Sequence, residues 1–368
     1  MASVIEKTIR KAVTPAIQVL AGVNRNRLPD ARTNPFLNGV HTPLREEFTL
    51  DDLHVTGSIP TELDGRYVRI GPNPYGKGDK GHHWFLGDGM VHGVRLKNGD
   101  AIWYRNRFIR SRDLEGKGGP KSVDGPRRGF GDTVNTNVLA IGDKIMALVE
   151  ASSFPVQLDD DLESVAYSDF GGGLTGSFNA HPHQCPATGE FHAICYDGMS
   201  ADTIRHVVLA RNGTVLCETE IAVRHGPSIH DCALTENFVV VLDLPVTFSM
   251  PALISGHRFP YRWNRAHKAR VGLLPRGGTG DQIVWHEVEP CYAFHVGNSF
   301  EDDRGQVVID LCAYETIFDG DMPGPYGKPL GLERWTVDGK GGQVQRDVLD
   351  SSPQEFPRPD ERFFTTDY

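Results

Sequence analysis

Alternating apolar and polar residues recur along most of the chain and predict short β-strands. In residues 82–111, apolar positions alternate on both sides of Asn98-Gly99, a dipeptide typical of a two-residue hairpin turn. Asp88-Gly89, in the same segment, carries a second hairpin signal. Similar pairs of apolar segments flank Gly142-Asp143 and Asn212-Gly213. Hairpins at this spacing, with almost no helix between them, predict an all-β chain of the β-propeller type rather than a β-sandwich.

One segment follows the helical period instead. Apolar residues from Val4 to Leu20 recur near helical spacing, with basic residues on the other side, and predict a short N-terminal helix over Met1–Gly22 that Pro15 interrupts. We expect this helix to pack on the body of the protein. The alternative is a basic amphipathic element that makes peripheral contact with a membrane or captures a lipid-like substrate.

Two assignments of chain organisation follow. We assign residues 1–33 to the helix and a lead segment, and residues 34–368 to a propeller domain. The segment from Leu114 to Gly131 is rich in glycine, lysine and arginine, and we expect it to form a long surface loop that could act as a lid.

Composition restricts the classes of function. A net charge of −10 and a pI near 5.8 argue against a nucleic-acid-binding surface. The six cysteines contain no CxxC pair, which predicts buried free thiols in a reducing compartment. We see no run of roughly 18 apolar residues and no signal-peptide pattern, so we expect a cytoplasmic protein.

Three histidines begin segments with a strong β-pattern. His181 precedes Pro182, a turn and an alternating strand, while His230 and His295 precede the β-prone runs Phe238–Leu244 and Gln306–Tyr314. A single strand-end histidine is more often structural than a metal ligand. Three in equivalent positions indicate a shared metal ion at the centre of the fold.

A series of motifs then resembles the carotenoid cleavage oxygenases, a family that also includes lignostilbene dioxygenases and retinoid isomerases. The motifs, in chain order, are GRYVRIGPNP, WFLGDGMVHGV, NTNVL, AHPHQCPATGE, HDCALTENFVV, FHVGNSFED and EFPRPDER. The resemblance runs from about Asn34 to the C-terminus. It implies a seven-bladed propeller with Fe(II) on its axis, held by four histidines, and oxidative cleavage of an alkene C=C bond by O2 to give two carbonyl products.

The resemblance also assigns site residues. His181, His230 and His295 match three of the four iron ligands, and Glu150 and Glu355 match carboxylates that accept hydrogen bonds from the ligand imidazoles. Imidazole nitrogen suits Fe(II), and a carboxylate that accepts the other ring N–H fixes the tautomer. We therefore expect both glutamates to be buried next to histidines.

The chain departs from the family at its C-terminal end. The fourth histidine of the family lies well beyond the EFPR motif, whereas this sequence has no histidine after His295 and ends at Tyr368. At 40 to 45 residues per blade, we expect the last one to two blades, about 50 to 90 residues, to be lacking. The two functional hypotheses are therefore an iron dioxygenase and an inactive propeller remnant that serves as a binding module; a calcium-dependent lactonase on a similar propeller is a distant third.

The other histidines have structural interpretations. We expect His183 to be a hydrogen-bonding neighbour of the site, and His82, His83 and His92 to flank a structural turn, with His92 as the fallback fourth ligand. The DDRG turn at residues 302–305 lacks the spaced oxygen ligands of a calcium loop and is read as a solvated turn.

Substrate choice depends on weaker signals. Lignostilbene-cleaving members carry a lysine just before the NTNV motif, where this chain has Gly131 and Asp132. This difference favours a carotenoid or apocarotenoid over a hydroxystilbene, and the lignostilbene-type activity is the alternative. An elongated apolar alkene needs a tunnel lined by aromatic side chains. The candidates, chosen by their nearness to the motifs, are Phe154, Phe248, Trp263 and Phe294.

Overall fold

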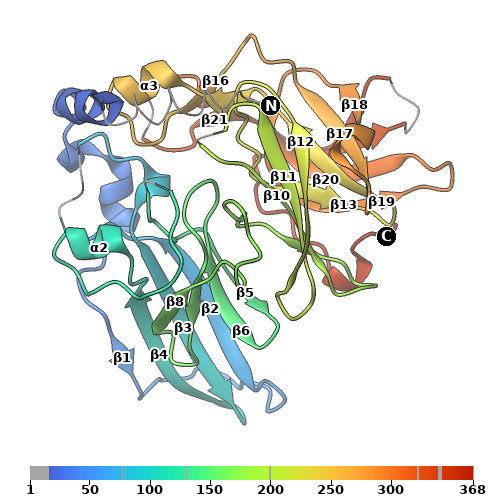
Figure 1. Ribbon diagram of the computed structural model, residues 1–368. Coiled ribbons are helices and arrows are strands. Elements are labelled where there is room, and N and C mark those ends of the chain that lie inside the picture. Colours follow the sequence, from blue (N-terminus) through green and yellow to red (C-terminus); the bar gives the residue numbers. More distant parts are fainter. Residues whose placement is uncertain are drawn as a thin grey trace.

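The computed structural model describes residues 16–76, 78, 80–129, 131–198, 200–320, 323–338 and 342–367. Residues 16–25 are helical, so the end of the predicted N-terminal helix is present, while Met1 to Pro15 lie outside the described residues. Figure 1 shows this helix, in dark blue, beside α3 (Met250–Ile254). Asn24 Nδ2 donates to the carbonyl of Ile254 at 2.8 Å, and Ala21 is 2 % exposed. The helix therefore packs on the body of the protein, as we expected.

Five four-stranded antiparallel sheets contain nearly all of the described strands, and each is formed by consecutive or nearly consecutive strands. The first has the order β1-β4-β3-β2, and the others run β5-β6-β7-β8, β12-β11-β10-β9, β13-β14-β17-β18 and β19-β20-β21-β22. β15 and β16, which lie between β14 and β17 in the chain, form a separate two-stranded sheet. Figure 1 shows the sheets following one another from β1–β4 in blue and teal to β19 and β20 in orange. This is the all-β, propeller-type arrangement that the strand spacing predicted, with a short N-terminal helix.

The strand bounds are β1 Thr49–Leu50, β2 Gly65–Pro72, β3 Gly89–Lys97, β4 Asp100–Phe108, β5 Asn137–Ile141, β6 Lys144–Leu148, β7 Val156–Leu158, β8 Ser164–Tyr167, β9 His183–Gln184, β10 Phe191–Cys195, β11 Thr203–Leu209, β12 Val215–Ala222, β13 Cys232–Leu234, β14 Phe238–Asp243, β15 Val246–Phe248, β16 Tyr261–Trp263, β17 Arg270–Pro275, β18 Val284–Glu287, β19 Tyr292–Glu301, β20 Val307–Ile317, β21 Gly327–Val337 and β22 Gln345–Asp350. The second described α-helix is α2, Arg112–Gly116, and 3₁₀ turns are η1 Ala31–Thr33, η2 Pro35–Leu37, η3 Gly39–His41, η4 Trp84–Leu86, η5 Gly280–Gln282 and η6 Glu361–Phe363.

Most of the predicted turns are present. Asn98-Gly99 joins β3 to β4, Gly142-Asp143 joins β5 to β6, and Asn212-Gly213 lies between β11 and β12. The DDRG segment is also a turn, between β19 and β20, in which Asp302 Oδ1 accepts from the backbone N–H groups of Arg304 and Gln306.

The hairpin predicted at Asp88-Gly89 is wrong. β3 begins at Gly89 and pairs with β2, so the connection between them spans residues 73–88. The Asp88 carboxylate is buried and accepts from Lys117 Nζ at 2.8 Å and from the backbone N–H of Tyr75 at 2.8 Å. A Cβ on Gly89 would lie 1.8 Å from the carbonyl oxygen of Val134. The dipeptide thus serves a buried ion pair and a close backbone approach rather than a turn.

The segment from Leu114 to Gly131 is, after its first three residues, the predicted surface loop: its described residues beyond α2 lie outside helices and strands and none is buried. Its start differs from the prediction. It starts within α2, and the side chain of Leu114 is completely buried against Met90 and Phe108. The burial of Leu114 could not be predicted from the sequence, because a single leucine among glycines and basic residues gives no periodic signal.

Two further expectations concern cysteines and membranes. All six cysteines are free, and five of them are buried, whereas Cys217 on β12 is exposed. Within the described ranges, we find no helix that is both long and apolar enough to cross a membrane.

Candidate metal centre

Three strand starts from three different sheets converge on one point. His181 lies just before β9, His230 just before β13, and His295 within β19. One ring nitrogen of each histidine lies within 4.8 Å of the others. The ring centroids are 4.4 Å apart for His181 and His230, and 4.9 Å apart for His230 and His295. The structure therefore brings together the three histidines that the sequence singled out.

Each of two histidines is held by a carboxylate. Glu150 Oε1 lies 2.8 Å from Nδ1 of His230, and Glu355 Oε2 lies 2.7 Å from Nδ1 of His295. Both glutamates are next to histidines, as expected, although their side chains keep 16 % and 23 % exposure. An ionised carboxylate can only accept, so a neutral ring in each pair carries its proton on Nδ1 and leaves a bare lone pair on Nε2.

The two bare nitrogens face each other. Nε2 of His230 is 3.2 Å from Nε2 of His295. Two acceptors at this distance repel unless a cation or proton lies between them. Metal–nitrogen bonds of about 2.1 Å that meet at about a right angle place two nitrogens about 3.0 Å apart. The donor set and its spacing therefore fit a metal ion.

His181 is held differently. Its backbone N–H donates to Asn179 Oδ1 at 2.6 Å, and its ring Nε2 is buried with no hydrogen-bond partner. A buried nitrogen without a partner is costly, and a metal ion satisfies it. Burial and the nearby imidazole of His230 lower the pKa of His181, which keeps its ring neutral as a metal ligand requires. For His230 the effect of burial is outweighed by the Glu150 carboxylate, which raises the pKa.

The other histidines lie where they have structural partners. His183 Nε2 donates to Asp231 Oδ1 at 2.7 Å, as expected of a neighbour of the site. His83 stacks on Phe259, and burial, followed by the effect of His82, lowers its pKa to about 3. His92 pairs with the hydroxyl of Tyr104 at 2.9 Å and is not in the cluster, so the fallback fourth ligand is wrong. Among the residues that the structure describes, no fourth histidine joins the other three.

A large cavity opens onto the three histidines. It has a volume of about 610 Å³ and is lined mainly by apolar and aromatic side chains, together with all three histidines and both glutamates. Phe248 and Phe294 line it, as the sequence suggested. Phe154 and Trp263 do not line it. Phe154 belongs to a separate hydrophobic cluster, whereas Trp263 packs against the same cluster as Phe248 and Phe294. Nearness to a motif in sequence does not tell where in the fold a side chain lies: Phe154 is outside the strands, and Trp263 is at the end of the β15-β16 sheet away from Phe248 and Tyr261.

Several lining residues were not singled out from the sequence, although Trp84, Phe85 and Phe356 lie within the motifs. The aromatic side chains that reasoning from the motifs missed are Trp84, Phe85, Tyr196, Phe259, Tyr261, Tyr314 and Phe356. Phe85 and Phe259 have ring centroids 5.5 Å apart, and Phe85 lies 6.2 Å from Phe294. These rings come from segments far apart in sequence, so only the tertiary structure shows that they form one wall of the cavity.

The structure also places Gly131 and Asp132, the residues just before the NTNV motif where the chain has no lysine. Gly131 lines the cavity, whereas the carboxylate of Asp132 accepts from the hydroxyls of Ser153 and Tyr167 at 2.9 Å and 2.6 Å. The cavity therefore has no amino group at this point.

Residues 41–368 match the family model described as "Retinal pigment epithelial membrane protein". The chain is 38 % identical over 374 residues to a carotenoid cleavage oxygenase of Mycobacterium tuberculosis, covering 89 % of this chain and 75 % of that protein. It is 30 % identical over 366 residues to carotenoid 9,10(9',10')-cleavage dioxygenase 1 of Arabidopsis thaliana, covering 89 % of this chain and 67 % of the relative.

Solved structures agree on the fold. The lignostilbene dioxygenase of Pseudomonas brassicacearum superposes with a TM-score of 0.79 at 26 % identity, over 93 % of this chain and 75 % of that one. The cobalt-substituted apocarotenoid oxygenase of Synechocystis gives 0.76 at 23 % identity, over 89 % and 75 % of the two chains.

Proposed function

Because the chain belongs to the carotenoid cleavage oxygenase family, we propose that it is a non-haem Fe(II) dioxygenase that cleaves a C=C bond of a carotenoid or apocarotenoid with O2 to give two carbonyl products. The observation that carries the proposal is the pair of bare Nε2 atoms of His230 and His295, 3.2 Å apart, at the wall of a large apolar cavity.

His181, His230 and His295 are the residues that would hold the iron. Neutral imidazoles are intermediate donors that suit Fe(II) and leave its positive charge uncompensated. When bound, the ion supplies the redox chemistry by which O2 reacts with an alkene. Glu150 and Glu355 orient the rings of His230 and His295 and raise their basicity by accepting the Nδ1 protons.

The cavity walls would bind and orient the substrate. The apolar lining excludes water from the reacting bond. Transfer of an elongated hydrocarbon from water to this lining is favourable. Phe294 lies 5.1 Å from the ring of His230, so a polyene that contacts Phe294 passes next to the candidate metal position.

A lignostilbene-type activity is the second candidate, favoured by the similarity to the Pseudomonas brassicacearum structure. A hydroxystilbene needs a polar partner for its phenol, and the segment before the NTNV motif places Gly131 at the cavity and turns Asp132 to hydroxyl groups. This arrangement supports the apocarotenoid.

The test is to load the chain anaerobically with Fe(II), add O2, and supply an apocarotenal and a hydroxystilbene in parallel. We expect the polyene absorbance to fall and two carbonyl products to form from the apocarotenal. Cleavage of the hydroxystilbene alone would favour the second candidate. Failure to bind iron or to cleave either substrate would overturn the proposal and leave a binding module.

A further inference from the structure

Two buried polar side chains link the backbones that carry the three histidines. They are Asn179, 1 % exposed, and Asp231, 5 % exposed. Neither contacts the large cavity. Their partners lie immediately beside the candidate ligands in the chain.

Asn179 joins the first histidine segment to the second. Its Oδ1 accepts from the backbone N–H of His181 at 2.6 Å, and its Nδ2 donates to the carbonyl of Ile194 at 2.7 Å and to that of Ile229 at 3.1 Å. Ile229 directly precedes His230. One amide therefore fixes the backbone at His181 relative to the residue before His230.

Asp231 joins the second segment to the first and the third. Its Oδ1 accepts from His183 Nε2 and from the backbone N–H of Cys232, both at 2.7 Å, and its Oδ2 accepts from the backbone N–H of Val296 at 2.9 Å. Val296 directly follows His295, and His183 lies two residues after His181. His230 is thus held on both sides, through Ile229 and through Asp231.

The contact with Val296 occurs where β19 is irregular. The register between β19 and β20 shifts between Ala293 and Val296, and again between Val296 and Asn298. Such bulges leave a residue outside the ladder and re-aim its neighbours. Asp231 accepts the N–H of Val296 at this bulge, and so fixes the local backbone from which His295 projects.

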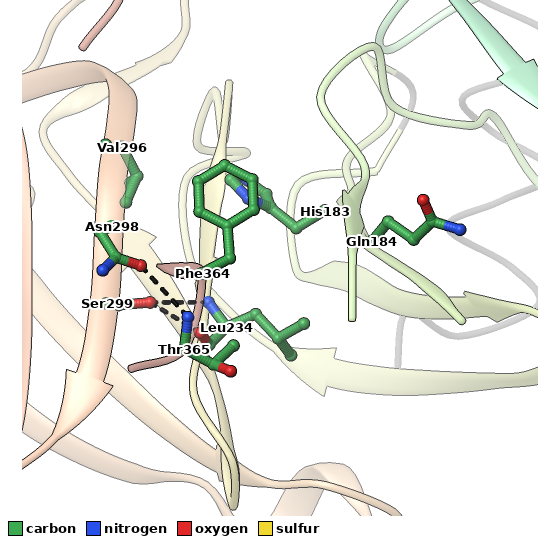
Figure 2. Close-up of a pocket in the computed structure, with 9 residues that line it drawn as sticks. His183, Gln184, Leu234, Val296, Asn298, Ser299, Phe364 and Thr365 are labelled. Atoms are coloured by element: carbon green, nitrogen blue, oxygen red, sulfur yellow. Dashed lines mark hydrogen bonds between the residues drawn. The ribbon is translucent and has the colours of Figure 1, made fainter. Parts of the chain in front are cut away.

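The C-terminal segment covers the same region. Figure 2 shows Phe364 over the ring of His183, with the side-chain oxygen of Asn298 accepting from the backbone N–H of Thr365. The centroids of the Phe364 and His183 rings are 6.3 Å apart. The covered, low-dielectric setting strengthens the hydrogen bonds of Asp231 and makes the loss of one costly.

We propose that Asn179 and Asp231 are positioning residues that hold His181, His230 and His295 in the metal-binding arrangement before the metal binds. This inference rests on the proposed metal site. Neither residue is expected to touch the metal or the substrate. They act by removing the backbone freedom that metal binding would otherwise have to restrict, which is the usual effect of a supporting shell.

The test measures metal affinity without turnover. Co(II) is titrated against a competing chelator, and the visible d–d spectrum of the bound Co(II) is recorded for the wild type, Asp231→Asn and Asn179→Asp. Asn at position 231 has one acceptor oxygen for three N–H donors, and Asp at position 179 loses both donors while keeping the acceptor for His181. We expect each variant to bind Co(II) about 10-fold to 100-fold more weakly, with an altered d–d spectrum.

A matched control is available in Asp243. It is also fully buried and accepts from a histidine, His267 Nε2, at 2.8 Å, and from Arg270 Nε at 2.7 Å, but it joins no segment that carries a candidate ligand. Asp243→Asn is expected to lower the stability while leaving Co(II) affinity and spectrum unchanged.

The outcomes separate the two proposals. A wild type that binds no Co(II) overturns the proposed metal site itself. A wild type that binds Co(II), together with folded variants that bind it equally well, overturns the positioning role alone. If Asp231→Asn does not fold, as judged by circular dichroism, the isosteric Asn179→Asp variant decides the question by the same titration.

Discussion

Nε2 of His230 lies 3.2 Å from Nε2 of His295, although the Nδ1 atom of each ring is already bound to a carboxylate. Glu150 and Glu355 thereby present two lone pairs to each other across a gap of the size that two ligands of one metal ion leave. Two histidines that share a proton have a similar spacing, so the metal assignment also depends on the buried, unpartnered Nε2 of His181. The predictions about the site follow from these relationships.

Removing either carboxylate acceptor is expected to weaken metal binding without unfolding the protein. Glu150→Gln and Glu355→Gln keep the shape of the side chain but weaken the acceptor, and they allow the ring proton to move to Nε2. Loss of such a partner typically costs 10-fold to 100-fold in affinity, which chelator competition measures.

The control for these two variants is Glu333→Gln. Glu333 is more deeply buried than either, accepts from Trp335 Nε1 at 2.7 Å and from Arg346 Nε at 2.8 Å, and contacts no candidate ligand. Unchanged metal affinity in Glu150→Gln and Glu355→Gln would show that the carboxylates do not orient the histidines.

The cavity prediction uses two aromatic residues of the same small sheet. Both pack against the same hydrophobic cluster, but Phe248 on β15 lines the cavity and Trp263 on β16 does not. Phe248→Ala removes apolar contact with the substrate. A loss of about 1.4 kcal/mol, close to the lower end of the range for burial of a phenylalanine, corresponds to a tenfold change in KM. We expect Phe248→Ala to raise KM for the apocarotenoid about tenfold with unchanged metal content, and Trp263→Ala to change stability but not KM. Steady-state kinetics that show the reverse order would contradict this role of the cavity.

A buried histidine pair away from the metal centre predicts how stability depends on pH. His192 Nδ1 and His206 Nε2 are 3.1 Å apart, and Arg276, Glu190 and Cys185 surround His192. Burial lowers the pKa of both rings to about 3, with further contributions from Arg276 and His183 at His192, and from His192 and Arg276 at His206.

Because the unfolded chain binds protons near pH 6.5 and the folded chain does not, stability is lost as the pH falls from about 6.5 towards 3. Each histidine contributes a slope of up to about 1.4 kcal/mol per pH unit in this window. His206→Gln is expected to reduce the slope of unfolding free energy between pH 6 and 4 by that amount, as measured by denaturant unfolding at several pH values. An unchanged slope would mean that His206 is not neutral in the folded protein.

Thiol reactivity is expected to single out one cysteine. All six cysteines are free, and Cys217 alone of the six is exposed. A thiol reagent should therefore modify one cysteine in the native protein and six after denaturation, and Cys217→Ser should remove the native reaction. Rapid modification of a second thiol would show that a buried strand opens readily.

Sequence patterns could predict the strand-rich fold because short-range signals specify it. Asn98-Gly99 and Gly142-Asp143 are local turn signals, and both turns are present. Asp88-Gly89 carries the same signal, but a buried ion pair to Lys117 overrides it. Such long-range partners leave no mark within a short window of sequence.

The candidate site, like the fold, was predicted only in part. The motifs located the three histidines and both glutamates, which the structure brings together. The roles of Asn179 and Asp231 depend on which backbone groups of other sheets face them. Phe248 and Trp263 share one face of the β15-β16 sheet, and the choice between them depends on which end of that sheet adjoins the cavity. Neither relationship can be read from residue order, because both depend on how separate sheets are placed.

The most direct test of the metal centre is the metal content after anaerobic loading with Fe(II), in the wild type and in His181→Ala, His230→Ala and His295→Ala. We expect about one iron per chain in the wild type and a large loss in each variant, because each removes one of the three converging nitrogens. Iron at background level in the wild type, or iron retained in all three variants, would contradict the assignment of these histidines as the metal site.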